Sequence, residues 1–168
     1  MKKIVFTLFA AAMLGSCATH SNEYVIHGTV ASHDLEGAKV YLVPMGEDIT
    51  KENIDSTYIH NQFFEFTGTQ ERVVDIRLER RKRLGVETLL VITEPGEIYV
   101  TLGQTSTGRG TPQNDSIQVW KHLTQSLYRK EIEREYYFSR SVQMAKNVGE
   151  KSTLGAFLLS RMPEEAKQ

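Results

Sequence analysis

The stretch VVDIRLER, residues 73–80, alternates between apolar and charged side chains. Successive side chains of a β-strand point to opposite faces, so the apolar residues share one face and the charged residues share the other. The apolar face comprises Val74, Ile76 and Leu78, and the polar face comprises Asp75, Arg77 and Glu79. This period of two predicts a strand with one face in the core and one face in solvent.

Six other segments between Glu23 and Leu102 also have the character of strands. Five of them carry alternating residues: 23–31, 38–44, 54–60, 63–68 and 97–102. The sixth, 86–93, is more uniformly apolar, which favours a central place in a sheet. Seven short strands separated by turns predict a mainly β fold, either an antiparallel β-sandwich or a partly open barrel.

Three short features support this arrangement of strands. Glu94-Pro95-Gly96 has the residues of a type II turn, with glycine at the position of positive φ. His60-Asn61-Gln62 precedes an aromatic strand and predicts a hairpin turn, because asparagine tolerates left-handed φ. Gly28, inside the first strand, indicates a bulge or a close approach of neighbouring atoms.

The pattern changes after Gly108 from strand-like to helical. Thr111 is a preferred N-cap residue, and Pro112 is favoured at the first helical position. Apolar residues then recur at roughly helical spacing: Ile117, Trp120, Leu123, Leu127, Ile132 and Tyr136. We expect one helix, straight or bent, from residue 111 to about Val148, and a shorter one over 152–162.

The chain therefore divides into a β-sandwich domain, 23–110, and a C-terminal helical segment, 111–168, packed on the sandwich or extending from it. The helical segment is rich in aromatic residues: Trp120, Tyr136, Tyr137, Phe138 and Phe157. These residues suit either packing against the sheet or a surface on which a partner docks.

The first residues, MKKIVFTLFAAAMLGSC, have the features of a secretory signal: two lysines, an apolar run and a small-residue end. The apolar run is too short to span a bilayer, which needs about 20 apolar residues. The segment Leu14-Gly15-Ser16-Cys17 resembles a bacterial lipobox. The resemblance implies cleavage of a signal peptide, 1–16, diacylglyceryl attachment at Cys17 and a lipidated tether, 17–22. The alternative is an ordinary signal peptide with an incidental cysteine.

Composition excludes several classes of protein. Cys17 is the only cysteine of the chain, so the mature domain has no disulfide, thiolate metal site or C-x-x-C pair. Removal of Lys2 and Lys3 with the signal shifts the formal net charge of −1 by two further negative units. A mildly acidic domain lacks the main driving force for nucleic-acid binding, and we expect no nucleic-acid partner.

Catalytic, cofactor and metal motifs are missing from the sequence. The five histidines do not recur at ligand spacing, there is no G-x-S-x-G, and the glycine-rich segment at Arg109 has no G-K-[ST]. We therefore expect no enzyme activity, cofactor or metal. Five basic residues are candidates for contact with an anion or a partner, with solvated loops as the alternative: Arg80, Arg81, Lys82, Arg83 and Arg109.

Five short motifs occur in a familiar order. They are Y-x-I-x-G from Tyr24, V-Y-L from Val40, F-x-F-x-G from Phe64, E-P-G-x-I-x-V from Glu94 and G-T-x-x-N-D from Gly110. In this order residues 23–162 resemble a β-rich domain of unknown function found in lipoproteins of Gram-negative gut bacteria. In that family the domain usually precedes a thioredoxin-like domain of the thiol-disulfide oxidoreductase type.

Two departures from the family pattern matter. Gln62 stands where the hairpin more often has glycine, and no residue matches the C-x-x-C of the thioredoxin-like domain, before which the chain stops. The resemblance thus implies only the anchored accessory domain. We expect a lipid-anchored binding or scaffolding module at the periplasmic face of the outer membrane, with an unidentified envelope partner. The alternative is the accessory half of a split or truncated thiol-disulfide oxidoreductase that acts with a thioredoxin-like partner.

Overall fold

The computed structural model describes residues 22–79 and 85–167. Its elements follow the chain in this order: β1 Tyr24–Val30, η1 His33–Leu35, β2 Lys39–Pro44, β3 Asp55–Tyr58, β4 Phe63–Gly68, β5 Val73–Leu78, β6 Leu89–Ile92, β7 Gly96–Leu102, β8 Thr107–Arg109, α1 Pro112–Tyr128, α2 Arg134–Val148, α3 Thr153–Ser160 and η3 Glu164–Ala166. Strands therefore come first and helices last, as the change of pattern after Gly108 predicted.

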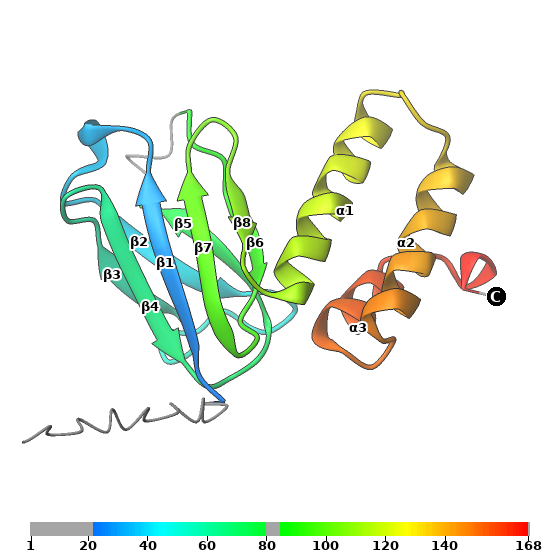
Figure 1. Ribbon diagram of the computed structural model, residues 1–168, viewed down its shortest axis with the longest axis horizontal. Helices are drawn as coiled ribbons and strands as arrows, with labels where there is room; N and C mark the ends of the chain where they lie inside the picture. Colours follow the sequence, from blue (N-terminus) through cyan, green and yellow to red (C-terminus); the bar gives the residue numbers. More distant parts are fainter. Residues whose placement is uncertain (1–21, 80–84, 168) are drawn as a thin grey trace, which may run out of the picture.

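Within the described residues, the strands form two four-stranded sheets that face each other as a sandwich (Figure 1). Sheet A has the order β4-β1-β7-β8 and sheet B the order β3-β2-β5-β6. Neighbouring strands are antiparallel except β1 and β7, which are parallel. The expected β-sandwich with C-terminal helices is confirmed, and the sheets do not close into a barrel. The seven expected strands all form, and β8 is an eighth that the sequence did not reveal.

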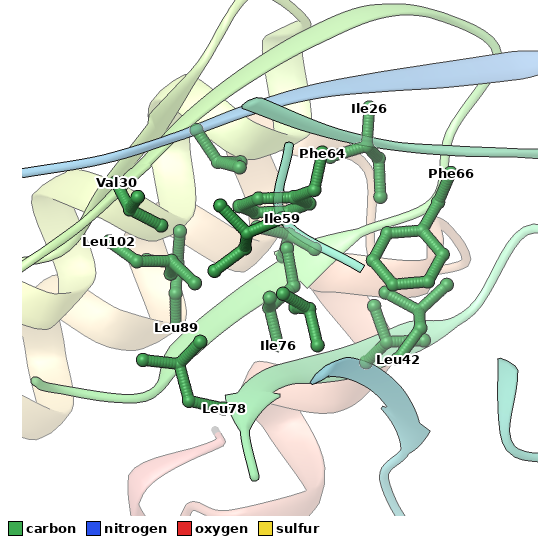
Figure 2. Packing of buried hydrophobic residues seen from close by; sticks show 14 of the residues in the cluster. Ile26, Val30, Leu42, Ile59, Phe64, Phe66, Ile76, Leu78, Leu89 and Leu102 are labelled. Atoms are coloured by element: carbon green, nitrogen blue, oxygen red, sulfur yellow. The ribbon is translucent and has the colours of Figure 1, made fainter. Parts of the chain in front are cut away.

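The first hydrophobic core fills the space between the two sheets. Its aliphatic and aromatic side chains come from both sheets, from Leu35 and Ala38 before β2, and from Ile59 between β3 and β4 (Figure 2). Val74, Ile76 and Leu78 all belong to it, as their alternation along the chain predicted. The alternating stretch therefore sets which face of β5 turns inward.

Two motifs of the sequence are explained by the pairing of β1 with β4. The strands run antiparallel, so that Tyr24 lies opposite Gly68 and Phe64 opposite Gly28. A Cβ added to Gly28 would come within 2.1 Å of the Phe64 ring, and one added to Gly68 within 2.6 Å of the Tyr24 hydroxyl. Each aromatic ring thus lies over the glycine of the other strand, which is the close approach that Gly28 indicated.

Two predictions about strands of sheet B were wrong, one on position and one on burial. Segment 86–93 was expected to be central, but β6 is an edge strand. Its side chains are buried on both faces: Leu89 and Val91 lie in the core between the sheets, and Leu90 and Ile92 pack with the helices. Strand β5 was expected to have one solvated face, but it is central and its Val73 and Asp75 are also buried. Apolar composition reports burial, and it does not distinguish a neighbouring strand from a neighbouring helix.

The expected continuous helix to Val148 was also wrong, because the chain breaks between α1 and α2. Lys130 adopts a positive φ of 58°. The Lys130 N–H donates to the Leu127 carbonyl, and the Glu131 N–H donates to the Ser126 carbonyl. This is the hydrogen-bond pattern of a Schellman C-cap, with lysine where glycine is usual. The end of α2 at Val148 and the short helix α3 agree with the prediction.

A second hydrophobic core joins the helices to the sandwich. It contains Val73 and Ile92 from the outward face of sheet B, together with buried side chains of all three helices. Among the aromatic residues, Trp120 and Tyr137 are buried in it, whereas Tyr136 is 53% exposed. Figure 1 shows α1 beside β6 and β8, with α2 on the far side of α1 from the sheets.

The hairpin between β3 and β4 accounts for the unusual Gln62. Asn61 and Gln62 have φ of 52° and 65°, as a two-residue hairpin turn of type I′ requires. The Glu36 carboxylate accepts the N–H groups of Asn61 at 3.0 Å and Gln62 at 3.2 Å. These two backbone hydrogen bonds hold the pKa of Glu36 below its usual value, and the nearby His60 contributes in the same direction. Glu36 thus supports a turn in which glycine would be less strained.

Candidate functional site

The predicted anchor, Leu14, Gly15, Ser16 and Cys17, lies outside the described residues. The described chain enters β1 at Tyr24, whose neighbours across the sheet are Gly68 and Gly96. The start of β1 is therefore at the end of the sandwich where β7 also begins, and α1 begins near the same end (Figure 1). A tether that precedes Tyr24 would leave the domain from this end.

Of the five basic residues predicted to contact an anion or partner, the structure describes only Arg109. Arg80, Arg81, Lys82 and Arg83 lie outside the described residues. On their C-terminal flank, the Glu87 N–H donates to the carbonyl of Gly103, just after β7 ends, so this flank lies opposite the end where β1 begins. Arg109 lies on β8 opposite Tyr99, exposed at an edge of sheet A. Joint contact by all five stays a prediction.

The start of α1 holds the most connected buried polar side chains of the described residues. Glu94 accepts the N–H of Gln113 at 2.7 Å and that of Asn114 at 3.1 Å. A carboxylate at this position also interacts favourably with the helix dipole. Thr111 is the N-cap residue, as predicted, but its side chain does not cap these groups. The free N–H groups of the helix start are therefore satisfied by an acid of the chain itself.

Asn114 and Gln113 extend this network in two directions. The fully buried Asn114 accepts the Ile92 N–H at 2.9 Å and donates to the Ile92 carbonyl at 2.7 Å, so its amide pairs with the edge of β6 as a strand would. Gln113 donates to Glu71 at 2.9 Å and accepts the Leu154 N–H at 2.8 Å. We name Glu71, Glu94, Thr111, Gln113 and Asn114 the polar joint, because they connect sheet B, α1 and α3.

Sequence reasoning missed the role of the polar joint. Glu94 was interpreted only as a turn residue, and Asn114 only as part of a motif. The signal was present in the motifs E-P-G and G-T-x-x-N-D, because neither a turn nor a helix start by itself requires Glu94 or Asn114. Their bonding within the fold is structural, because each of these buried polar groups has its partner inside the domain.

A second buried acid, Asp75, lies on the outward face of β5, the face that also carries Val73. Asp75 is 7% exposed, and one carboxylate oxygen lies 2.6 Å from the Arg77 Nε. The other, Oδ1, has no hydrogen-bond partner among the described residues. Burial lowers the pKa of Lys121 on α1, although the negative charges of Glu87 and Asp75 act in the opposite direction. Lys121 donates to the Ser106 carbonyl at 3.0 Å, which fixes α1 against the loop before β8.

The outward face of sheet A carries an ionic and aromatic row. His27 on β1 lies between two acids, with Nε2 bonded to Glu97 and Nδ1 3.5 Å from Glu65. Its ring stacks on Tyr99 with the centroids 5.3 Å apart. The two carboxylates meet opposite nitrogens of the ring, so they do not converge on one point. These contacts link β4, β1 and β7 on the exposed face of sheet A.

The outward side of the helical pair is hollowed. Two adjoining hollows of about 350 and 170 Å³ lie between α1 and α2, and both are lined by Val119, Arg140 and Met144. We name them together the helical groove. The other lining residues are Ser116, His122, Leu123, Ser126, Ile132, Tyr136, Gln143, Asn147 and Val148. The groove is mainly apolar, and no acidic residue lines it.

A separate hollow of about 570 Å³ lies between α2 and the C-terminal turn η3. Phe138, Val142 and Pro163 give it apolar walls, while Glu135, Glu165 and Lys146 carry charges of both signs at its lining. Its mixed charges give no preference for a cation or an anion.

The described ranges contain neither a metal-binding cluster nor a membrane-spanning helix. Within 22–79 and 85–167, no group of three or more His, Cys, Asp or Glu residues is arranged to hold a metal ion. No helix in the described part of the chain has the length and apolar character required to cross a membrane.

Comparison with known proteins gives one match. A family described as a domain of unknown function, DUF4369, matches residues 24–117, from the first residue of β1 to Ile117 in α1. The matched range contains the whole sandwich and the part of α1 that belongs to the polar joint. No curated protein and no solved structure matches the chain.

Proposed function

The chain belongs to the DUF4369 family of domains of unknown function, and from this premise we propose that it is a lipid-anchored binding or scaffolding module of the cell envelope without catalytic activity. The observation that carries the proposal is the lipobox-like Leu14-Gly15-Ser16-Cys17, placed seven residues before the first strand, at Tyr24. Acyl chains contribute about 0.8 kcal/mol of membrane affinity per buried CH₂, and two or more chains hold a protein stably.

Anchoring at Cys17 gives the domain a defined orientation. A six-residue tether, 17–22, spans at most about 20 Å when fully extended. It enters the domain at the end where β1 and β7 begin, so this end faces the bilayer. The flanks of the basic run 80–83 are at the opposite end, about 20 Å away along the strands.

The absence of catalysis in this proposal rests on how the polar side chains are used. Glu94, Gln113 and Asn114 are the most connected buried polar residues described, and their groups bond to the backbone and side chains of the domain. A catalytic acid or base needs access to a substrate proton. The polar joint supports a structural role for these residues, and the exposed surfaces are left for binding.

The anchor is tested with Cys17→Ser in the source bacterium. We expect the variant to leave the detergent phase on phase partitioning and to lose the mass of the lipid. Ser16→Ala is the matched control, because alanine keeps a small residue before the cysteine and should leave lipidation intact. Unchanged membrane fractionation and unchanged mass of Cys17→Ser would contradict the proposal. Density separation of the two membranes with protease protection tests the predicted periplasmic face of the outer membrane.

A second candidate function is the accessory half of a split or truncated thiol-disulfide oxidoreductase. It is favoured by the resemblance of residues 23–162 to domains that precede a thioredoxin-like domain, and by the lack of any cysteine after Cys17 in this chain. An adjacent reading frame that encodes a thioredoxin-like domain with C-x-x-C would favour it. Crosslinking in the native envelope should then capture that protein reproducibly, and capture of no redox protein would favour the stand-alone module.

A further inference from the structure

The helical groove is formed by two stripes of side chains that the antiparallel helices bring together. On α1 the stripe contains Ser116, Val119, Leu123 and Ser126, and on α2 it contains Tyr136, Arg140 and Met144. Residues three or four apart lie on one face of a helix, so each stripe is continuous. Leu123 and Met144 also pack against the second core, so the floor of the groove is continuous with it. Val119, Tyr136 and Arg140 form its exposed part.

Parts of the groove lining are open to solvent. Val119 is 58% exposed and Tyr136 is 53% exposed. A small ligand is usually enclosed over most of its surface, which an open lining of this kind does not provide. A groove between two helices with apolar side chains along it suits the apolar face of a third helix.

The charge of the groove selects the type of helix. Arg140 lines both hollows, His122 lines one of them, and no acidic residue lines either. Among the described residues, no carboxylate lies within ion-pair distance of Arg140. A carboxylate on the occupant would therefore find a cation that is not already paired.

The same charge disfavours the two other occupants. If two copies of the chain packed groove against groove around a two-fold axis, Arg140 of one copy would lie close to Arg140 of the other, and like charges repel. A lipid surface binds a protruding apolar face of a helix, whereas the lining here is concave. We infer that the helical groove binds an amphipathic, acidic helix of a partner protein. This inference rests on the proposed function as a binding module and names the chemistry of the partner.

The test uses the full-length protein in phosphatidylcholine nanodiscs and two fluorescent peptides of about 18 residues. Both peptides carry leucine at i, i+3, i+4 and i+7, and they differ in having glutamate or lysine at the flanking positions. Empty nanodiscs correct for binding to lipid. We expect the acidic peptide to bind about tenfold or more tightly than the basic peptide. Equal binding of the two peptides, or no binding of either, would overturn the inference.

Variants then assign the binding to the groove. Arg140→Glu should weaken binding of the acidic peptide about tenfold and favour the basic peptide instead. Arg134→Glu, on the same helix but outside the groove lining, is the matched control and should change neither affinity. Equal affinities of Arg140→Glu and the parent would overturn the assignment. If Arg140→Glu does not fold, the inference is still tested by whether the parent protein binds the acidic peptide more tightly than the basic peptide.

Self-association is measured separately by analytical ultracentrifugation. A monomer that binds the acidic peptide supports the inference, whereas a dimer that Val119→Glu dissociates would show that a second copy fills the groove and would overturn it. The peptide measurements report on the helical groove and not on the tether, so they are made with the protein in buffer if Cys17 carries no lipid. Failure of the lipid anchor in the Cys17→Ser experiment is therefore distinguishable from failure of the groove to bind.

Discussion

The part of the chain that matches the family and the part that follows it use their side chains differently. In the matched part, residues 24–117, the motif residues stabilise the fold itself. The aromatic rings of β1 and β4 pack over glycines, and the buried groups of the polar joint hydrogen-bond within the domain. After Ile117, the helices bury one side in the second core, but they leave Val119, Tyr136 and Arg140 open to solvent. The comparison indicates that the family motifs serve the fold, whereas the helices after Ile117 are the part to which we assign binding.

The largest effect that this comparison predicts is at Asn114. In Asn114→Ala the buried N–H and carbonyl of Ile92 lose their partner, and each unsatisfied group costs about 1–3 kcal/mol. We expect the free energy of unfolding in urea to fall by about 3 kcal/mol. Asn147→Ala is the matched control on the exposed side of α2 and should have little effect. Equal losses in the two variants would remove the distinction between the polar joint and the surface.

The next effect is expected at Gly28, inside the matched part. The Cβ of Gly28→Ala would lie 2.1 Å from the Phe64 ring, so the ring must shift in a filled core. Overpacking of this kind costs about 2 kcal/mol. Gly103→Ala is the control, because its Cβ would meet only Ala31 at 3.4 Å. Adding Phe64→Leu to Gly28→Ala should recover part of the loss, because the ring is removed. The pairing of ring and glycine would be contradicted if the double variant lost more free energy of unfolding than the two single variants lose together.

The sequence was sufficient to predict where the strands lie along the chain, but not which elements pack beside them. The alternation of Val74, Ile76 and Leu78 predicted the inward face of β5, because period two follows from strand geometry alone. The apolar run 86–93 did not reveal that β6 is an edge strand, because a helix buries a strand as well as another strand does. Strand β8 was missed, because Thr107–Arg109 is too short for a visible alternation.

The candidate surface was harder to predict from the sequence than the strands. The helical groove exists only because α1 ends at Tyr128, and the turn that ends it has Lys130, not glycine, in the left-handed conformation. A continuous helix would not place Val119 beside Arg140. The polar joint was hidden for a related reason: Glu94 and Asn114 are twenty residues apart, and no local rule pairs them.

A smaller, pH-dependent effect is expected at the surface of the matched part. Hydrogen bonds from Asn61 and Gln62 lower the pKa of Glu36 in the folded state. A carboxyl with a lowered folded pKa stabilises the fold above its unfolded pKa, and this contribution is lost as the pH falls through the folded pKa. Glu36→Gln should therefore be less stable than the parent at pH 7, and the difference should shrink in acid, as urea unfolding at several pH values can show.

The control for Glu36 is Glu150→Gln, an exposed carboxylate without a hydrogen-bond partner among the described residues. The difference in the free energy of unfolding between Glu150→Gln and the parent should be close to zero at every pH. A difference between Glu36→Gln and the parent that is constant with pH would mean that the carboxylate charge does not support the hairpin.

The smallest effect should come from Tyr136, and this prediction tests the other side of the comparison. Tyr136 is 53% exposed in the helical groove, and glutamine is a good helix former. Tyr136→Gln should therefore change the free energy of unfolding by no more than about 0.5 kcal/mol. If it cost as much as Asn114→Ala, the tyrosine would be part of the core, and the helices would be scaffold like the sandwich. A stable Tyr136→Gln that binds the acidic peptide more weakly would place the residue on a binding surface that the fold does not need.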